Sequence, residues 1–298
     1  MPEGRASTTH DIGFALAEPL AARRSFDRAT DTFDSASFVH DRAREILCER
    51  LGLLSRAPQV ILDLGCGTGA SARALSARFP GSTVVALDSS ANMCARTQSK
   101  ADAKPIVADA AHVPLATGCI DLVFANLVLP SCRPEIVFAE VERVLAPGGL
   151  FLFATLGPAT LQELRDAWRQ VDSAIHVHVS FEPQMIGDWL ARAGLAEPVV
   201  DVDRVTLSYR DVAQIHADLR ASGGRNVAGG RRRTLTGARR FAGYAKALAA
   251  TAVDGRIRVT CELILGAAWG RARSERARRE PREAFAVPVA SIKRRSLS

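Results

Sequence analysis

Short apolar segments alternate with stretches of helical period between residues 57 and 156. The first is Val60–Leu64, and three more end at Asp88, just before Asp109, and at Asn126; a fifth follows a proline-glycine turn. Each has the length of a strand, and a helix is predicted between the first two. This order of strand, glycine turn and helix predicts a doubly wound α/β sheet, whose ligands bind at the carboxyl ends of the strands.

The pattern after residue 156 predicts further helices and two more strands. Thr160 and Glu163 are spaced as a capping box for an amphipathic helix. A second helix is predicted from Pro183 to Gly194, and a sixth strand ends near Tyr209. Two helices follow, the second over residues 236–250, before a last strand that comes after an Asp-Gly turn.

Composition limits the class of protein. The 298 residues are 47% hydrophobic and 24% charged, which is enough for one large core. No run is apolar enough to span a bilayer, and the first ten residues lack the apolar core of a signal peptide. The six cysteines stand singly, without zinc spacing. We therefore expect a cytoplasmic protein with free thiols and no metal.

The net charge of +7 comes from two local features. Residues 271–298 carry nine Lys or Arg and three Glu, and residues 220–246 carry eight Lys or Arg and no acid. The first feature is expected to be a disordered tail. The second contains the glycine-rich stretch GGRNVAGGRRRTLTG, residues 223–237. A nucleic-acid binder would more often spread its charge along one face, so we expect no nucleic acid as partner.

The stretch LDLGCGTG, residues 62–69, carries the strongest chemical signal. Gly65, Gly67 and Gly69 allow the backbone to approach a ligand closely. The same glycines also fit the dinucleotide fingerprint loosely. Asp63 argues against that reading, because it would repel a pyrophosphate and attract a ligand that carries an amino group and a sulfonium.

These residues resemble motif I of the class I S-adenosylmethionine-dependent methyltransferases. Asp88 would accept both ribose hydroxyls, although alone it would fit NAD equally well, and Asp109 would lie beside the adenine amino group. Singly, Asp63 could cap a turn and Asp88 could be a loop acid. The resemblance implies a seven-stranded, mostly parallel Rossmann-like sheet with S-adenosylmethionine bound by the following residues: Asp63, Gly65, Cys66, Gly67, Gly69, Asp88, Ser89, Met93, Asp109, Ala110 and Asn126.

The last two strands of this fold normally pair directly, but here residues 209–256 intervene. An insertion there is expected to lie over the cofactor pocket as a helical substrate lid. The helical segment before the first strand, which includes Phe26 and Phe33, commonly closes over the cofactor. We expect a methyltransferase domain over residues 24–270 with a disordered tail over residues 1–23.

Segments outside the cofactor motifs are similar to the malonyl-acyl-carrier-protein O-methyltransferases of biotin synthesis. They include FDRATDTFD, HVHVSF, GRNVAGGRRRTLTG and ELILGAAWG, and the resemblance runs from Arg24 to Gly270. It implies methylation of the free carboxylate of a malonyl thioester, on acyl carrier protein or coenzyme A. Such a carboxylate is ionised at pH 7, so no catalytic general base is needed.

The arginine-rich segment would then bind negative partners. One arginine can hold one carboxylate oxygen, and others can receive an acidic carrier protein and its phosphopantetheine arm. The alternative is that the arginines are only solvent-exposed side chains of a surface loop and bind no partner. The candidates for binding the substrate carboxylate or the carrier are Arg225, Asn226, Arg231, Arg232, Arg233 and His176.

Other functions of proteins with the same fold remain as alternatives. Related respiratory complex I assembly factors, which resemble a protein-arginine hydroxylase, share HVHVSF but lack GRRRTLTG. A protein that binds cofactor and partner without transfer is a further alternative. Two departures from the family concern substrate identity: Phe33 stands where tyrosine is common, and residues 125–132 read ANLVLPSC, without the usual serine at 125 and glutamine-tryptophan at 131 and 132.

Overall fold

The computed structural model describes residues 17–271 and contains a seven-stranded sheet of order β3-β2-β1-β4-β5-β7-β6. Only β7 runs against the others, since it pairs antiparallel with both β5 and β6. This confirms the predicted fold class. The strands are β1 Val60–Leu64, β2 Thr83–Asp88, β3 Lys104–Val107, β4 Ile120–Asn126, β5 Leu145–Leu156, β6 Ala196–Tyr209 and β7 Ile257–Trp269.

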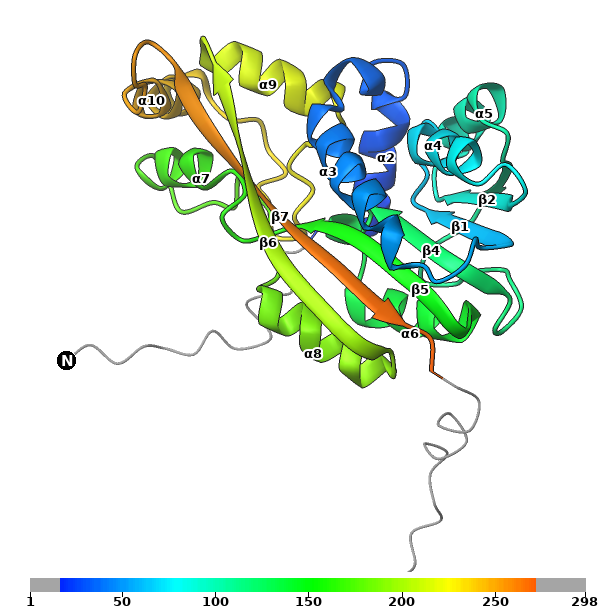
Figure 1. The fold of residues 1–298 in the computed structure, drawn as a ribbon. Coiled ribbons are helices and arrows are strands. Elements are labelled where there is room, and N and C mark those ends of the chain that lie inside the picture. Colours follow the sequence, from blue (N-terminus) through cyan, green and yellow to red (C-terminus); the bar gives the residue numbers. More distant parts are fainter. Residues whose placement is uncertain (1–16, 272–298) are drawn as a thin grey trace, which may run out of the picture.

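Helices cover both faces of the sheet (Figure 1). Apolar residues of α6 and α8 pack on one face, and those of α3 and α4 pack on the other. The helices of this central part are α3 Phe38–Glu49, α4 Ala70–Arg78, α5 Ala91–Lys100, α6 Pro134–Val144 and α8 Pro183–Ala193, with short 3-10 turns η1 Phe33–Ala36, η2 Arg50–Leu53 and η3 Leu129–Ser131.

Strands β6 and β7 form a long antiparallel pair that extends beyond the rest of the sheet (Figure 1). We call this pair the hairpin, although the insertion joins its two strands. Helices α7 Gln162–Arg169, α9 Val212–Ala221 and α10 Ala238–Ala249 gather at its far end. A separate apolar cluster joins them to the strands through residues such as Trp168, Ile215 and Tyr244. We call these three helices and the end of the hairpin the distal module.

The N-terminal helix α2, Pro19–Ala29, starts before the expected domain boundary at residue 24. Proline at the first helical position favours this start. The chain beside it also bonds to the insertion, because Glu18 N donates to Val227 O at 2.8 Å and Ser25 Oγ to Gly223 O at 3.0 Å. The domain therefore extends to at least residue 17, while the expected basic tail lies outside the described residues from 272 onward.

The predicted capping box of α7 is wrong. Thr160 Oγ1 donates to Glu262 O of β7, and Glu163 accepts hydrogen bonds from Thr260 N and Oγ1. Leu161, with a left-handed φ of 57°, precedes the helix instead. These side chains fasten α7 to the hairpin rather than capping it, because β7 offers partners that the local sequence does not show.

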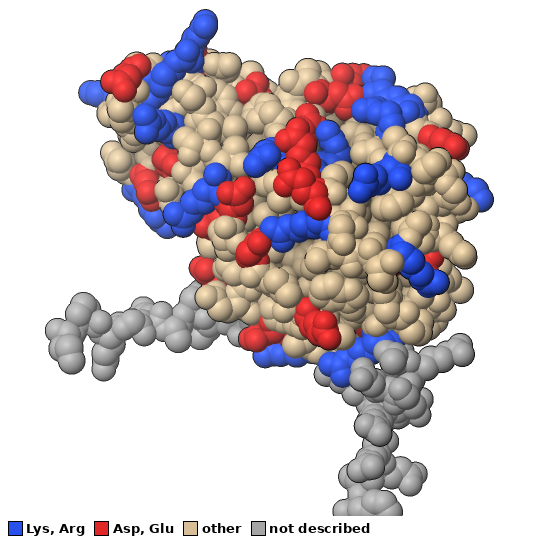
Figure 2. Space-filling model, in the orientation of Figure 1, with Lys and Arg blue, Asp and Glu red and all other residues tan. Residues whose placement is uncertain are grey.

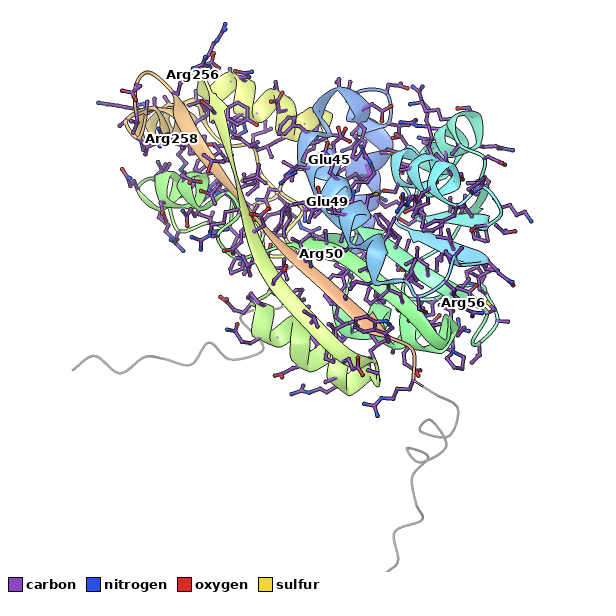
Figure 3. The ribbon with its side chains drawn as sticks, viewed as in Figure 1. Glu45, Glu49, Arg50, Arg56, Arg256 and Arg258 are labelled. Atoms are coloured by element: carbon purple, nitrogen blue, oxygen red, sulfur yellow. The ribbon has the colours of Figure 1, made fainter. Side chains whose placement is uncertain are left out.

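Surface charges of both signs are interspersed on the face shown in Figure 2. Some pairs brace the sheet from outside: Arg50 Nη2 lies 2.7 Å from Asp201 Oδ2, and Arg56 Nη2 lies 3.5 Å from Asp121 Oδ1. Figure 3 shows Arg50 beside the hairpin and Arg256 at its far end. This face carries no large field of one sign that would suggest a polyanion partner.

Candidate active site

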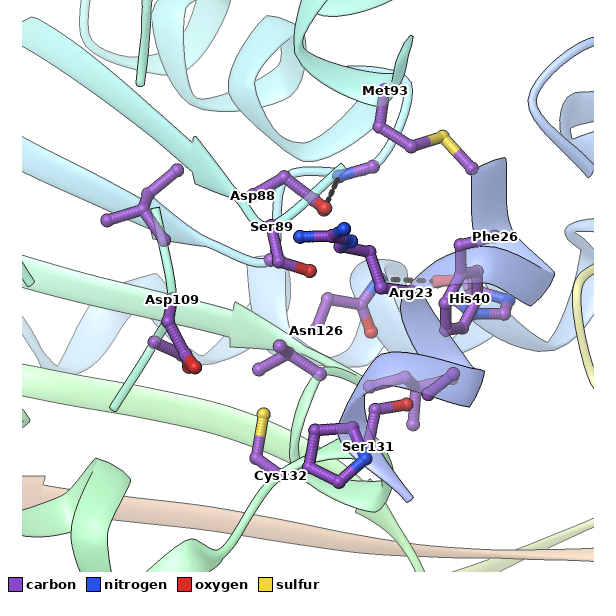
Figure 4. Close-up of a pocket in the computed structure, with 18 of the residues that line it drawn as sticks. Arg23, Phe26, His40, Asp88, Ser89, Met93, Asp109, Asn126, Ser131 and Cys132 are labelled. Atoms are coloured by element: carbon purple, nitrogen blue, oxygen red, sulfur yellow. Dashed lines mark hydrogen bonds between the residues drawn. The ribbon is translucent and has the colours of Figure 1, made fainter. Parts of the chain in front are cut away.

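A cavity lies at the carboxyl ends of β1, β2 and β4, where the sequence predicted a ligand (Figure 4). We call it the strand-end cavity. It holds about 870 Å³ of empty space, counted to its open mouth and including solvent there. The predicted residues on its wall are Gly65, Gly67, Asp88, Ser89, Met93, Asp109, Ala110 and Asn126.

The glycine loop and Asp88 support one another. Gly65 and Gly67 have φ values of 76° and 53°, a left-handed conformation that glycine adopts without strain. Gly67 N donates to Asp88 Oδ2 at 3.0 Å, and Ser90 N donates to Asp88 Oδ1 at 2.8 Å. Burial raises the pKa of Asp88 despite these bonds. The carboxylate is thus fixed in place at the cavity edge.

Three of the predicted residues do not line this cavity: Asp63, Cys66 and Gly69. Asp63 is 1% exposed, and its Oδ2 is enclosed without a partner among the described residues. Burial raises its pKa to about 7, with a smaller contribution from Asp88. Arg44 acts in the opposite direction but does not offset the burial, so a bound positive ligand would further favour the ionised carboxylate.

The roof of the strand-end cavity comes from residues outside the glycine and acidic motifs. Among them, Phe26 belongs to the segment expected to close the pocket, whereas Arg23 and His40 were not identified. Helix α2 contributes Arg23 and Phe26, and α3 contributes His40. Asn126 Nδ2 donates to the carbonyl of His40 at 2.9 Å and so joins the end of β4 to α3. The general expectation that an N-terminal helical segment closes the pocket is met. The individual side chains could not be chosen from periodicity alone.

Two further cavities lie next to the first and share wall residues with it or with each other. The middle cavity shares Ala22, Phe26, His40, Leu127 and Ser131 with the strand-end cavity. The basic cavity, against the distal module, shares these residues with the middle cavity: Leu161, Val177, His178, Leu219, Gly224 and Arg225. The insertion therefore lines the second and third cavities, whereas α2 covers the first. The expectation that the insertion lies directly over the cofactor pocket is therefore wrong, because the insertion lines the neighbouring two cavities instead.

The fold supplies acids to three of the four predicted arginines. Arg231 Nη1 lies 2.9 Å from Glu18 Oε2, and Arg233 Nη2 lies 3.7 Å from Glu18 Oε1. Arg232 Nη2 lies 3.9 Å from Asp172 Oδ2. The arginine-rich segment contains no acid of its own, but the fold brings Glu18 and Asp172 to it from elsewhere in the chain.

Arg225 differs from these three arginines. It forms no ion pair with any residue in the described range 17–271, and it lines both the middle and the basic cavity. Arg231 and Arg232 line the basic cavity, while Arg233 lines none of these three cavities. An unpaired guanidinium on a cavity wall is available to bind an anion.

His176 belongs to a buried stack rather than to a metal site. Its ring lies 3.6 Å from that of Trp168, whose other face stacks on Tyr244 at 4.1 Å. His176 Nε2 lies 2.8 Å from Asp172 Oδ1. Burial alone would raise the pKa of Asp172, but the His176 contact and neighbouring positive charge lower it. Asn226, also predicted, donates to Ile175 O at 2.7 Å and lines the same basic cavity.

Two negative findings concern residues 17–271 only. They contain no cluster of three or more histidine, cysteine or acidic side chains that could hold a metal ion. Nor does that part of the chain include a helix with the length and apolarity needed to cross a membrane.

The fold and the acidic strand ends define a class I methyltransferase. A family model described as "Methyltransferase domain" matches residues 62–153. The YcgJ protein from Bacillus subtilis has a similar fold, with a TM-score of 0.52, 17% identity, and coverage of 76% of this chain and 98% of that one.

Curated relatives identify the family. The malonyl-[acyl-carrier protein] O-methyltransferase of Methylovorus is 41% identical over 266 residues, covering 85% of this chain and 90% of that protein. The one of Laribacter hongkongensis is 39% identical over 260 residues, covering 83% and 88%. The chain belongs to the malonyl-[acyl-carrier protein] O-methyltransferase family.

The cofactor of this enzyme is S-adenosylmethionine, and the strand-end cavity suits it. The acidic residues Asp88 and Asp109 stand on the wall with only one basic residue, Arg23, and Asp63 is enclosed without lining this cavity. A dinucleotide pyrophosphate would meet these acids unfavourably. Burial raises the pKa of the Cys132 thiol to about 12, so this cysteine on the wall is a neutral thiol and not a nucleophile.

Binding of S-adenosylmethionine is expected to release a proton near neutral pH. The pKa of Asp63 is raised to about 7, and a nearby cation favours the ionised carboxylate. Affinity should therefore rise as pH increases through about 7 and level off above it. Titration calorimetry at pH 7 in two buffers of different ionisation enthalpy measures the release, and Asp63→Asn should remove most of it. Equal heats in both buffers for the wild type would contradict this assignment.

Proposed function

We propose that this enzyme transfers a methyl group from S-adenosylmethionine to the free carboxylate of malonyl-acyl carrier protein, giving the ester that primes pimelate and biotin synthesis. The observation that carries the proposal is the row of three neighbouring cavities, each of which shares wall residues with the next. Their shared walls run from the strand-end cavity through the middle cavity to the basic cavity. A carrier protein is too large to enter, but its long thioester arm can follow this route.

Charge changes along the route in the order that such a substrate requires. The walls shared by the strand-end and middle cavities contain no charged side chain at pH 7, because burial lowers the pKa of His40 to about 4 and its ring is neutral. The lining of the basic cavity includes Arg220, Arg225, Arg231 and Arg232 and no acid. Arg231 and Arg232 also lie near Glu18 and Asp172, so the unpaired Arg225 is the first candidate for the phosphodiester of a phosphopantetheine arm, with the others nearer the acidic surface of its carrier.

The chemistry needs positioning more than proton transfer. S-adenosylmethionine supplies, when bound, an electrophilic methyl group on a sulfonium. The malonyl carboxylate is ionised at pH 7, so no side chain has to remove a proton. Apolar groups such as Phe26 and Leu127 exclude water where the two cavities meet. Removing water from the carboxylate and fixing its direction of approach are the contributions of this chain to the rate.

The direct test follows methyl transfer from methyl-labelled S-adenosylmethionine. Malonyl-acyl carrier protein is the expected acceptor, with acetyl-acyl carrier protein and malonyl-coenzyme A as parallel substrates. Label recovered as a base-labile ester on the malonyl carrier, and not on the acetyl carrier, is the expected result. The absence of label on both malonyl thioesters, with cofactor binding intact, would overturn the proposal. The ratio between carrier and coenzyme A measures how much the protein surface of the carrier contributes.

Arg225→Ala is expected to raise KM for malonyl-acyl carrier protein about tenfold, because a hydrogen bond to a charged group contributes about 1.5–3 kcal/mol. Turnover at saturation and the Kd for S-adenosylmethionine should change less than threefold, since Arg225 does not line the strand-end cavity. Steady-state kinetics and calorimetry measure both. The matched control is Arg256→Ala, which removes an exposed arginine at the far end of the hairpin. Equal KM values in the two variants would rule out this role.

A further inference from the structure

The wall shared by the strand-end and middle cavities contains only two polar side chains. Of its five residues, Ala22, Phe26 and Leu127 are apolar, and His40 and Ser131 are the other two. Under the proposed function, on which this inference rests, the malonyl carboxylate must reach the methyl group at this junction. The predicted arginines do not stand there, because Arg225 lines only the middle and basic cavities.

His40 is held in place by its surroundings. Its carbonyl accepts the hydrogen bond from Asn126 Nδ2, and its ring meets Phe33 edge to face at 4.9 Å. Nδ1 is enclosed without a partner. Nε2 likewise has no hydrogen-bond partner in the described chain but is not among the enclosed atoms. Of the two ring nitrogens, Nε2 is therefore the one that a ligand can reach.

The imidazole is neutral under working conditions. Burial lowers the pKa of His40 to about 4, and the nearby Arg44 acts in the same direction against Asp41. A neutral ring carries one N–H, which can donate without placing a positive charge beside a sulfonium. With the proton on Nε2, the enclosed Nδ1 is left as an acceptor only, and the donor faces the cavity.

Ser131 is the second polar side chain of the shared wall. It ends the 3-10 turn η3 after β4, and its hydroxyl has no hydrogen-bond partner within the described residues. Figure 4 shows Ser131 and His40 on different elements, both across the drawn cavity from Asp109. Two donors from separate elements can hold one carboxylate from two directions.

We infer that His40 and Ser131 bind the malonyl carboxylate for methyl transfer, through His40 Nε2–H and the Ser131 hydroxyl. Neutral donors orient the carboxylate and leave more electron density on the attacking oxygen than a bidentate arginine would. The arginines are then left to the phosphate and the carrier. The pair also gives selectivity against acetyl thioesters, which lack a carboxylate and would leave both donors unpaired.

The test compares His40→Phe, His40→Gln and Ser131→Ala with the wild type on malonyl-acyl carrier protein. His40→Phe keeps an aromatic ring against Phe33 but removes the donor, so kcat should fall about 30-fold. The amide of His40→Gln reaches close to the position of Nε2 and should recover at least tenfold over His40→Phe. Ser131→Ala should lower kcat about tenfold. The Kd for S-adenosylmethionine should stay within threefold in all three variants.

Several results would overturn the inference. His40→Phe and Ser131→Ala within threefold of wild-type kcat would do so, as would a glutamine variant no better than phenylalanine. A large kcat loss in Arg225→Ala would assign the carboxylate to that arginine instead. If His40→Phe does not fold, Ser131→Ala and His40→Gln still decide. A wild-type enzyme that forms no ester would overturn the proposed function itself, and this is measured before any variant.

Discussion

Asp88→Ala is expected to lower the affinity for S-adenosylmethionine about a hundredfold or more. Asp88 stands at the end of β2 on the cavity wall, where its carboxylate can accept ribose hydroxyls. It also accepts hydrogen bonds from Gly67 N and Ser90 N. The substitution therefore removes an anchor of the glycine loop together with the proposed ligand contact, and each charge-assisted hydrogen bond contributes about 1.5–3 kcal/mol. Titration calorimetry measures the Kd.

The matched control for this variant is Asp102→Ala. Asp102 is exposed between α5 and β3 and lines none of the three neighbouring cavities. Its replacement removes the same charge and should change the Kd less than threefold. If Asp88→Ala bound the cofactor as tightly as this control, the assignment of the strand-end cavity would be wrong.

Gly65→Ala is expected to reduce the free energy of unfolding by about 3 kcal/mol, for two reasons that add together. The residue has a left-handed φ of 76°, and an added Cβ would lie 2.5 Å from Val128 Cβ. Val128 follows β4 on the cavity wall, so relief of the clash has to move the backbone that shapes the site. Denaturant titration measures the stability, and cofactor binding should weaken in the same variant.

Substitutions at two other glycines distinguish the cost of the left-handed backbone from the cost of the clash with Val128. Gly118 has a φ of 68°, but its added Cβ would lie 3.9 Å from Leu145 O, an ordinary contact. Gly118→Ala should therefore cost only the conformational part, about 1 kcal/mol. Gly52 has no atom within 4 Å of an added Cβ, so Gly52→Ala should change stability by less than about 0.5 kcal/mol. A Gly65→Ala variant as stable as Gly118→Ala would mean that Val128 yields without cost.

The cofactor half of the site could be predicted from sequence because its determinants are local. The glycines, Asp88, Asp109 and Asn126 each lie at or just after the end of a predicted strand. Parallel strands bring their carboxyl ends to one edge of a sheet. Strand order was thus sufficient to place these residues together without knowledge of any side-chain contact.

The substrate half depends on contacts between distant parts of the chain. Arg231 is paired by Glu18, 213 residues away, and the carbonyl of His40 is held by Asn126, 86 residues away. Neither relation leaves a periodic signal. The capping box failed for the same reason, since Thr160 and Glu163 found partners on β7. The sequence likewise could not show that Arg225 lacks an ion-pair partner among the described residues while Arg231, Arg232 and Arg233 have one.

The distal module has its own apolar cluster and is carried mainly by two strands that leave the central sheet. The residues proposed to hold the methyl donor lie in the central part, and the basic cavity is lined by α7, α9 and α10 together with loop residues in 175–178 and 224–236. The two recognition tasks are therefore separately mutable. Under the proposed function, changes in the module and its loops would alter which carrier is accepted while the methyl-donor site is inherited intact.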